Sequence, residues 1–163
     1  MKYQEALKIA LQVKSVLEPH CDRIEIAGSI RRQKPYVKDI EIVAIPKPYE
    51  TGLFSSGIAP IINQWEKVKG ELPCKYTQRI LPEGIKLDLF FAKKENWGLI
   101  YAIRTGSADY SHFVLAQGWV KNGYKSVDGQ LTYKGQIVPV LEEEDLFKIA
   151  GVKYVAPQLR ISK

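Results

Sequence analysis

One short segment, DIEIVAI at residues 39–45, constrains the fold of this chain more than any other. Isoleucine and alanine alternate there with Asp39, Glu41 and Val43, which is the period-two pattern of a strand that buries one face. Because Asp39 and Glu41 are two residues apart, their carboxylates leave the strand on the same face, about 6–7 Å apart along it. Such carboxylates repel each other unless a cation lies between them. The segment therefore predicts a sheet with one buried face and one face that carries acidic side chains.

A third carboxylate, Asp88, follows the same pattern in the segment IKLDLFF. Leu87 and Leu89 are expected to point into the core, and Asp88 is expected to point away from it. The runs at residues 75–81 and 85–92 are joined by Pro-Glu-Gly, which predicts a β-hairpin. Carboxylates that converge from two strands provide the oxygen ligands that Mg²⁺ takes, and they leave positions open for a substrate phosphate.

An anion site is expected just before the first pair of carboxylates. The pentapeptide GSIRR at residues 28–32 comes directly after a predicted strand at residues 23–27. A glycine there lets a phosphate approach the backbone, and a serine hydroxyl and free N–H groups at a helix start can bind it. Arginine adds a charge-assisted contact. Each feature alone is usually a turn, a solvated strand face or surface charge, but their order along one chain favours a site that clamps a nucleoside triphosphate.

The rest of the chain predicts an α/β (α+β) fold, in which a mixed sheet is flanked by helices. Helices are expected at residues 3–18, 58–69, 97–104 and 108–120, and from residue 142 onward. Asp128-Gly129 predicts a hairpin turn, and Pro46, Pro48 and Gly52 predict a loop. We expect a nucleotide-handling first domain at residues 1–94 and a small α+β domain at residues 95–163.

Composition narrows the class of protein. The 163 residues carry 24 basic and 18 acidic side chains, a formal net charge of +6, and most of the excess lies before residue 95. Such a balance favours a polyanionic partner such as nucleic acid, although a merely soluble basic protein has the same balance. No run of eighteen apolar residues exists, which excludes a membrane-spanning helix. The charged N-terminal residues are not expected to form a secretory signal, and Cys21 and Cys74 lack metal or redox spacing, so we expect an intracellular, reducing compartment.

Four separated segments also resemble, in order, the motifs of family X DNA polymerases. The nucleotidyltransferase core of that family, Gly-Ser-x-Arg-Arg followed by Asp-x-Asp, is similar to GSIRRQKPYVKDIEIVAIP, and the strand of its third aspartate is similar to KLDLFFA. Its Thr-Gly-Ser segment resembles RTGSADYSHFVLAQG, and its C-terminal pattern resembles VPVLEEEDLFKIAGVKYVAPQLR. The resemblance runs from about Arg23 to Arg160. It implies a polymerase palm followed by a small C-terminal domain, as in the smallest forms of the family.

By this resemblance, the chain is expected to be a magnesium-dependent DNA polymerase that adds deoxynucleotides to a primer 3′-hydroxyl, with gap filling in DNA repair as its role. Its partners would be primer–template DNA and a deoxynucleoside triphosphate, and its cofactor would be two Mg²⁺ ions, or Mn²⁺. The implied catalytic residues, which are also the metal ligands, are Asp39, Glu41 and Asp88. The implied nucleotide contacts are Gly28, Ser29, Arg32, Gly106 and Ser107, and the implied nucleic-acid contacts are Lys86, Arg104, Ser111 and His112. We expect the protein to be a monomer.

Two departures from the family pattern leave alternatives open. Glu41 stands where the family has its second aspartate, and Ile103 and Arg104 replace the aromatic pair that often precedes Thr-Gly. The longer arm of Glu41 changes the geometry of a metal site, and the missing rings leave the choice between ribose and deoxyribose open. One alternative is a nucleotidyltransferase that uses another acceptor, such as an RNA end, a protein or a small molecule, or that needs no template. Another is a catalytically inactive DNA-binding module.

Overall fold

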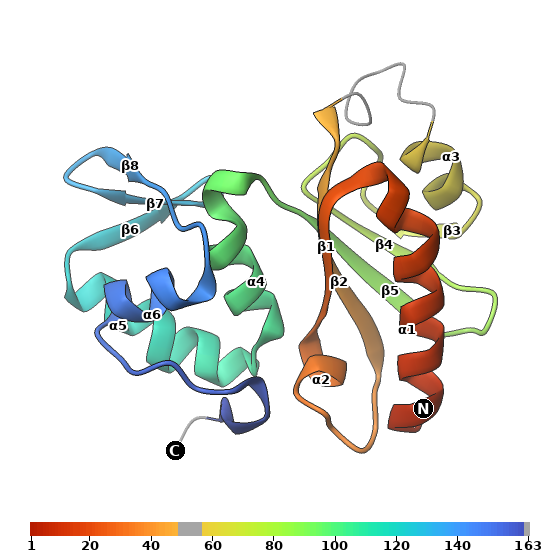
Figure 1. The fold of residues 1–163 in the computed structure, drawn as a ribbon, viewed down its shortest axis with the longest axis horizontal. Coiled ribbons are helices and arrows are strands. Elements are labelled where there is room, and N and C mark those ends of the chain that lie inside the picture. The colour runs from red at the N-terminus through yellow and green to blue at the C-terminus, as the bar shows by residue number, and fades with distance from the viewer. Residues whose placement is uncertain (49–56, 162–163) are drawn as a thin grey trace. The chain divides into compact units, whose positions relative to one another are not determined.

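The computed structural model describes residues 1–48 and 57–161 (Figure 1). The chain forms two compact units, Met1–Ala92 and Lys93–Lys163. Both combine helices with a β-sheet, and the larger sheet is mixed and flanked by helices, which confirms the predicted α+β class. Gly52 of the predicted loop lies outside the described residues. Within the described residues, we find no helix with the length and apolar character needed to cross a membrane.

The described residues of the first unit form one long helix, two short helices and five strands. Its elements are α1 (Tyr3–Leu17), β1 (Cys21–Ala27), α2 (Gly28–Arg31), β2 (Asp39–Pro46), α3 (Ile58–Asn63), β3 (Glu66–Lys69), β4 (Tyr76–Ile80) and β5 (Lys86–Phe91), with a 3₁₀ turn at Glu18–His20. The helix α1 ends at Leu17, and Pro19 lies in the 3₁₀ turn that follows, where its missing N–H cannot continue the hydrogen bonds of the helix.

The strands of this unit form one sheet in the order β1-β2-β5-β4-β3. The neighbours β2 and β5 pair in parallel, whereas the other neighbouring strands are antiparallel. In the parallel register, Asp39 lies next to Lys86, and Glu41 lies next to Asp88. Because residues paired in register point to the same side of a sheet, these four side chains share one face. We call it the carboxylate face.

The opposite face of the sheet is packed against helices. Ile40 and Ile42 of β2 and Leu87 and Leu89 of β5 are fully buried in one core with the apolar side of α1. Figure 1 shows α1 lying along the sheet. Each such side chain stabilises the fold by about 1.5–3 kcal/mol when it is fully buried. A one-residue slip of β2 would bring carboxylates into this core, so the apolar packing fixes the carboxylate face.

The helix predicted at residues 58–69 is wrong beyond its first half. The helix α3 ends at Asn63, and Glu66–Lys69 forms the edge strand β3, which pairs with β4. The predicted apolar stripe included Val68, but this side chain is 44% exposed. Pairing with β4 gives the backbone of this exposed segment its hydrogen-bond partners. All side chains of β3 are exposed, so the strand has no buried face whose alternation the sequence pattern could reveal.

The second unit combines helices with a small antiparallel sheet in the order β6-β7-β8. Its elements are a 3₁₀ turn at Lys94–Asn96, α4 (Trp97–Thr105), a π-helix at Tyr110–Ala116, α5 (Gln117–Lys121), β6 (Tyr124–Val127), β7 (Gln130–Tyr133), β8 (Gln136–Val138), α6 (Glu143–Ala150) and a 3₁₀ turn at Pro157–Leu159. Asp128 and Gly129 join β6 to β7 with positive φ angles of 51° and 75°, which confirms the predicted hairpin turn. The core of this unit includes Leu115, Leu146 and Phe147.

The helix predicted at residues 108–120 is present, but its central part is a π-helix and not an α-helix. Its central residues, Tyr110–Ala116, are π-helical, and α5 continues it to Lys121. Asn122 and Gly123, with a φ of 90° at the glycine, end it as predicted. Over so few turns, the apolar spacing of a π segment differs little from that of an α-helix, so the sequence pattern indicated a helix but not its pitch.

Candidate functional site

Asp39 and Asp88 interact on the carboxylate face of the first unit. Asp39 begins β2 and is partly exposed, whereas Asp88 in β5 is only 7% exposed. Burial raises the pKa of Asp39, and the negative charge of Asp88 raises it further, while Lys38 and Lys86 act in the opposite direction. The repulsion that acts on Asp39 thus comes from the neighbouring strand, as expected for carboxylates that converge without a cation.

Glu41 lies against the glycine loop that follows β1. Gly28 has a φ of +63°, and a Cβ atom at this position would lie 1.8 Å from Oε2 of Glu41, so only glycine fits. Burial lowers the pKa of the Arg32 guanidinium at the end of α2, and the charge of Glu41 opposes this shift. The loop that the sequence assigns to phosphate binding therefore receives the Glu41 carboxylate in this structure.

The predicted catalytic residues have different neighbours: the charge of Asp88 acts on Asp39, whereas Glu41 lies against Gly28 and acts on Arg32. Over residues 1–48 and 57–161, no three His, Cys, Asp or Glu side chains are grouped closely enough to hold a metal ion. The register of β2 and β5 nevertheless puts all three carboxylates on one face.

Asp39 and Asp88 fit a divalent cation of the Mg²⁺ type. Both offer the hard oxygen ligands that this ion prefers. A bound cation would also relieve the repulsion that raises the pKa of Asp39. Lys86 of β5 is the register partner of Asp39 and is exposed. It therefore places a positive charge next to Asp39, and the resemblance implies that this residue contacts the primer.

Two residues of β4 that the sequence analysis missed also contact Asp88. The hydroxyl of Tyr76 donates to Oδ1 of Asp88 at 2.5 Å, and Nε2 of Gln78 donates to the same oxygen at 2.7 Å. Gln78 is the register partner of Asp88 in the antiparallel pair of β4 and β5. The signal was present in the sequence, because a hairpin with its turn at residues 82–84 pairs residue 78 with residue 88 on one face.

The remainder of the predicted phosphate loop is a single helical turn. Ser29 is partly buried in α2, and its carbonyl accepts the N–H of Lys34 at 3.0 Å. The N–H of Arg32 donates to the carbonyl of Gly28 at 3.1 Å and closes the turn. The three predicted nucleotide contacts of this unit are therefore held in one small segment beside the carboxylate face.

In the second unit, Gly106 and Ser107 form the turn between α4 and the helix that follows. Gly106 has a φ of 71°. The N–H of Ser107 donates to the carbonyl of Arg160 at 3.3 Å, and Oγ of Ser107 accepts the N–H of Tyr110 at 3.2 Å, as at a helix N-terminus. The turn that the resemblance assigns to the nucleotide is thus tied to the C-terminal segment of the same unit.

The predicted nucleic-acid contacts of this unit differ in exposure. Arg104 and His112 are exposed, and the His112 ring meets Phe113 edge-on, with 4.6 Å between the centroids. Ser111 is only 7% exposed, and its hydroxyl donates to the carbonyl of Ile103 at 2.9 Å. A hydroxyl that is buried and bonded to the backbone is out of reach of a nucleic acid, so we withdraw Ser111 from the set of contacts.

A buried ion pair, which the sequence analysis also missed, anchors the C-terminal segment. Arg160 is fully buried, and its Nη1 donates to Oε2 of Glu143 at 2.7 Å, while its Nε donates to the carbonyl of Val155 at 2.8 Å. The guanidinium also lies over the rings of Phe147 and Tyr154, at 4.9 and 5.3 Å from their centroids. These contacts fix the backbone segment whose carbonyl bonds to the turn after α4.

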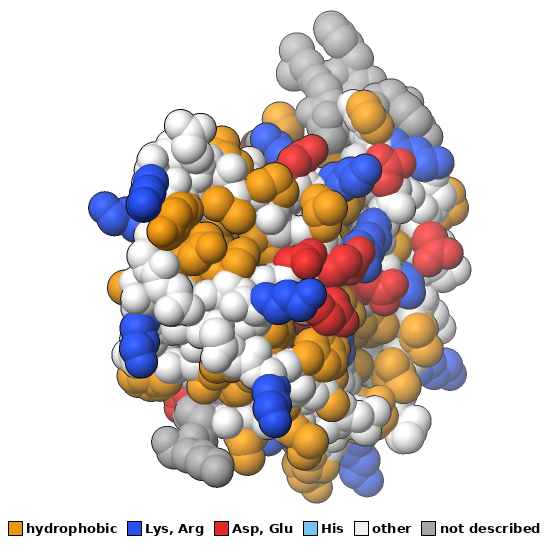
Figure 2. All heavy atoms as spheres, turned by 60° about the vertical axis from the view of Figure 1, so that its left-hand side comes forward, with side chains coloured by type: hydrophobic (Ala, Val, Ile, Leu, Met, Phe, Trp, Pro, Cys, Tyr) orange, Lys and Arg blue, Asp and Glu red, His pale blue; other side chains and the backbone are white. Residues whose placement is uncertain are grey.

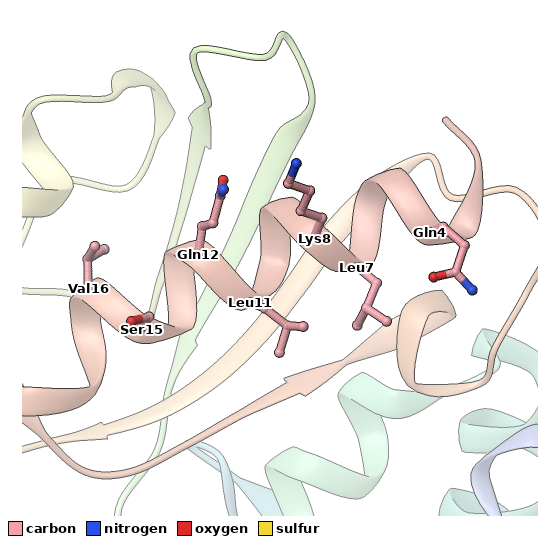
Figure 3. A pocket seen from close by; sticks show the side chains of 7 residues that line it. All are labelled: Gln4, Leu7, Lys8, Leu11, Gln12, Ser15 and Val16. Atoms are coloured by element: carbon pink, nitrogen blue, oxygen red, sulfur yellow. The ribbon is translucent and has the colours of Figure 1, made fainter.

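Figure 2 shows a group of acidic side chains on one face of the molecule. A separate groove of about 560 Å³ follows α1 on the helix-covered side of the sheet. Its lining consists of Gln4, Leu7, Lys8, Leu11, Gln12, Ser15 and Val16. All of them come from α1 itself (Figure 3), and Lys8 is the single ionisable side chain among them, so this lining offers no group of residues for catalysis.

Comparison with known proteins does not assign the chain. No protein-family model matches it, and no curated protein matches it significantly. The chemistry of the candidate site therefore follows from its own residues and their surroundings.

Proposed function

We propose that this protein is a Mg²⁺-dependent nucleotidyltransferase that adds deoxynucleotides to the 3′-hydroxyl of a DNA primer and fills gaps during DNA repair. The observation that carries the proposal is the pair of Asp39 and Asp88 on the carboxylate face, beside the loop of Gly28 and Arg32. A net charge of +6 supports a polyanionic substrate.

The candidate site residues of the first unit have different roles in the proposed reaction. Asp39 and Asp88 would hold the metal, together with Glu41 once its side chain leaves Gly28. Mg²⁺ bound there would lower the pKa of the primer hydroxyl and neutralise charge on the triphosphate. Ser29 and Arg32 would bind the outer phosphates, Arg32 through charge-assisted hydrogen bonds.

The proposed step exchanges one phosphorus–oxygen bond for another. The primer 3′-oxygen bonds to the α-phosphorus of the incoming nucleotide, the bond from that phosphorus to the bridging oxygen breaks, and pyrophosphate leaves. The primer hydroxyl gives up its proton to the carboxylate nearest to it, which by the family resemblance is Asp88. By the same resemblance, Lys86, Arg104 and His112 contact the nucleic acid, and the Gly106–Ser107 turn contacts the sugar and base.

Primer extension on DNA with a one-nucleotide gap tests this function. The protein is incubated with Mg²⁺ and either deoxynucleoside or ribonucleoside triphosphates, and the product length is read on a gel. We expect template-directed addition of the deoxynucleotide, and its loss when EDTA removes the metal. Template-independent transfer to single strands or RNA would favour a different acceptor. No incorporation with Mg²⁺ or Mn²⁺ would contradict the proposal.

One observation favours a second candidate, a DNA-binding module without catalysis. Glu41 stands in place of the family's aspartate and lies against Gly28 instead of joining Asp39 and Asp88. Such a module would bind DNA in a salt-sensitive way and incorporate no nucleotide. Fluorescence anisotropy and primer extension with the same gapped DNA separate the two candidates, because only the polymerase gives a signal in both.

A further inference from the structure

Two side chains of the neighbouring strand β4, which have no role in the proposed function, form hydrogen bonds to the carboxylate of Asp88. Tyr76 and Gln78 of β4 both donate to its Oδ1, at 2.5 and 2.7 Å. Two donors on a single oxygen restrict the rotation of the carboxylate group more than one donor would. They also bring the hydrogen-bonding capacity of that oxygen close to its limit, because each carboxylate oxygen has two lone pairs.

The Tyr76 ring that presents the hydroxyl is itself held in place. It stacks on Phe90, with 4.8 Å between the centroids and 23° between the planes. Phe90 is only 8% exposed and lies on β5, two residues beyond Asp88. Nζ of Lys69 lies 5.5 Å from the centroid of the Tyr76 ring, within cation–π range. The hydroxyl therefore reaches Asp88 from a ring with a fixed position.

We propose that Tyr76 and Gln78 are positioning residues that orient the carboxylate of Asp88 for metal binding. The strand β5 lies between β4 and β2 in the sheet. With Oδ1 held by two donors from β4, the other oxygen of Asp88 is the one left for a metal, on the sheet face that Asp88 shares with Asp39 of β2. The inference rests on the proposed function, because it takes Asp88 as a metal ligand. Removing polar partners of metal ligands typically lowers metal affinity or activity about 10–100-fold.

The test compares Tyr76→Phe and Gln78→Met with the wild type in the full chain. Tyr76→Phe keeps the ring on Phe90 and removes the hydroxyl, and Gln78→Met keeps the side-chain length and removes the donor. Tyr133→Phe is the matched control, because Tyr133 is 38% exposed on β7 and is not among the residues assigned to the metal, the nucleotide or the DNA. Electron paramagnetic resonance measures the affinity for Mn²⁺ without nucleotide or DNA, and primer extension gives the half-saturating Mg²⁺ concentration. Thermal melting verifies that each variant folds, and either variant alone suffices for the test.

We expect each positioning variant to weaken Mn²⁺ binding and to raise the half-saturating Mg²⁺ concentration about 10-fold or more, with a smaller effect on turnover at saturating Mg²⁺. The control should behave like the wild type. Wild-type Mn²⁺ affinity in a folded Tyr76→Phe or Gln78→Met protein would overturn the positioning role, even if the wild type polymerises. Weakened Mn²⁺ binding in variants of a protein that incorporates no nucleotide would support the positioning role and contradict the proposed function. A wild type that does not bind Mn²⁺ would overturn both.

Discussion

At the scale of single residues, Asp39 of the candidate site lowers the stability of the fold when it is ionised. Burial and the charge of Asp88 raise its pKa. A carboxyl whose pKa is raised by folding holds its proton more tightly in the folded state. The free energy of unfolding therefore falls as the pH rises through its titration range. At neutral pH the ionised Asp39 destabilises the fold unless a cation joins the pair.

Replacing Asp39→Asn should therefore raise the thermal midpoint at neutral pH in EDTA. The gain should shrink as the pH is lowered, because the wild-type side chain then becomes neutral in both the folded and the unfolded state. Mg²⁺ should stabilise the wild type and leave the variant unchanged, since a ligand stabilises only a state that binds it. Thermal melts across pH check this, with Asp22→Asn, an exposed position on β1, as the control. An Asp39→Asn protein that is no more stable than the wild type in EDTA would contradict this account.

Gly28 of the predicted phosphate loop lies against the carboxylate of Glu41. Alanine there must adopt a φ of +63°, which costs about 1–3 kcal/mol. Its Cβ also overlaps Oε2 of Glu41. We expect Gly28→Ala to lower the free energy of unfolding, and to lower it less in a Glu41→Ala background, where the overlap is absent. Urea denaturation of the two single variants and the double variant measures this coupling. Strictly additive effects would show that Glu41 does not lie against Gly28.

At the scale of elements, the strands of the candidate site could be predicted because their signals are local. The alternation in β2 and β5 fixes which side chains are buried, and the turn at residues 82–84 fixes the register of β4 against β5. From that register, the contacts of Tyr76 and Gln78 with Asp88 could also have been predicted. The edge strand β3 could not, because all of its side chains are exposed and its sequence therefore shows no alternation of buried and exposed residues. Nor could the place of Glu41, which depends on how the loop after β1 folds back onto β2.

The C-terminal segment of the second unit depends on the ion pair between Arg160 and α6. Arg160→Ala would remove the buried ion pair with the carboxylate of Glu143, which is 5% exposed. We expect a loss of about 3–5 kcal/mol in the free energy of unfolding, as for other buried pairs that lose one member. Lys14→Ala, which breaks the more exposed contact with Glu25, should cost about 1 kcal/mol or less. Urea denaturation measures both, and an equally small effect of the two changes would show that the buried pair does not anchor the segment.

At the scale of the whole molecule, the excess of positive charge should make the affinity for DNA depend on the salt concentration. Each phosphate contact of a basic side chain releases a counterion, so the logarithm of the affinity should fall by about 0.9 per contact for each tenfold rise in salt. Lys34 and Lys38 are exposed in the segment between α2 and β2. Changing both to Gln should flatten the salt dependence by about 1–2 in slope. Lys153→Gln, an exposed position in the second unit, should not change it. Anisotropy titrations of gapped DNA at several salt concentrations measure the slopes, and an unchanged slope in the double variant would remove this segment from the DNA contact.

The central claim is that Asp39 and Asp88 are the catalytic pair of a nucleotidyltransferase. The most direct measurement is single-turnover incorporation of one deoxynucleotide into gapped DNA at saturating Mg²⁺, for the wild type, Asp88→Asn and the control Asp22→Asn. The account predicts that Asp88→Asn binds the DNA as the wild type does but loses incorporation, while Asp22→Asn keeps it. Incorporation by Asp88→Asn at the wild-type rate would contradict it.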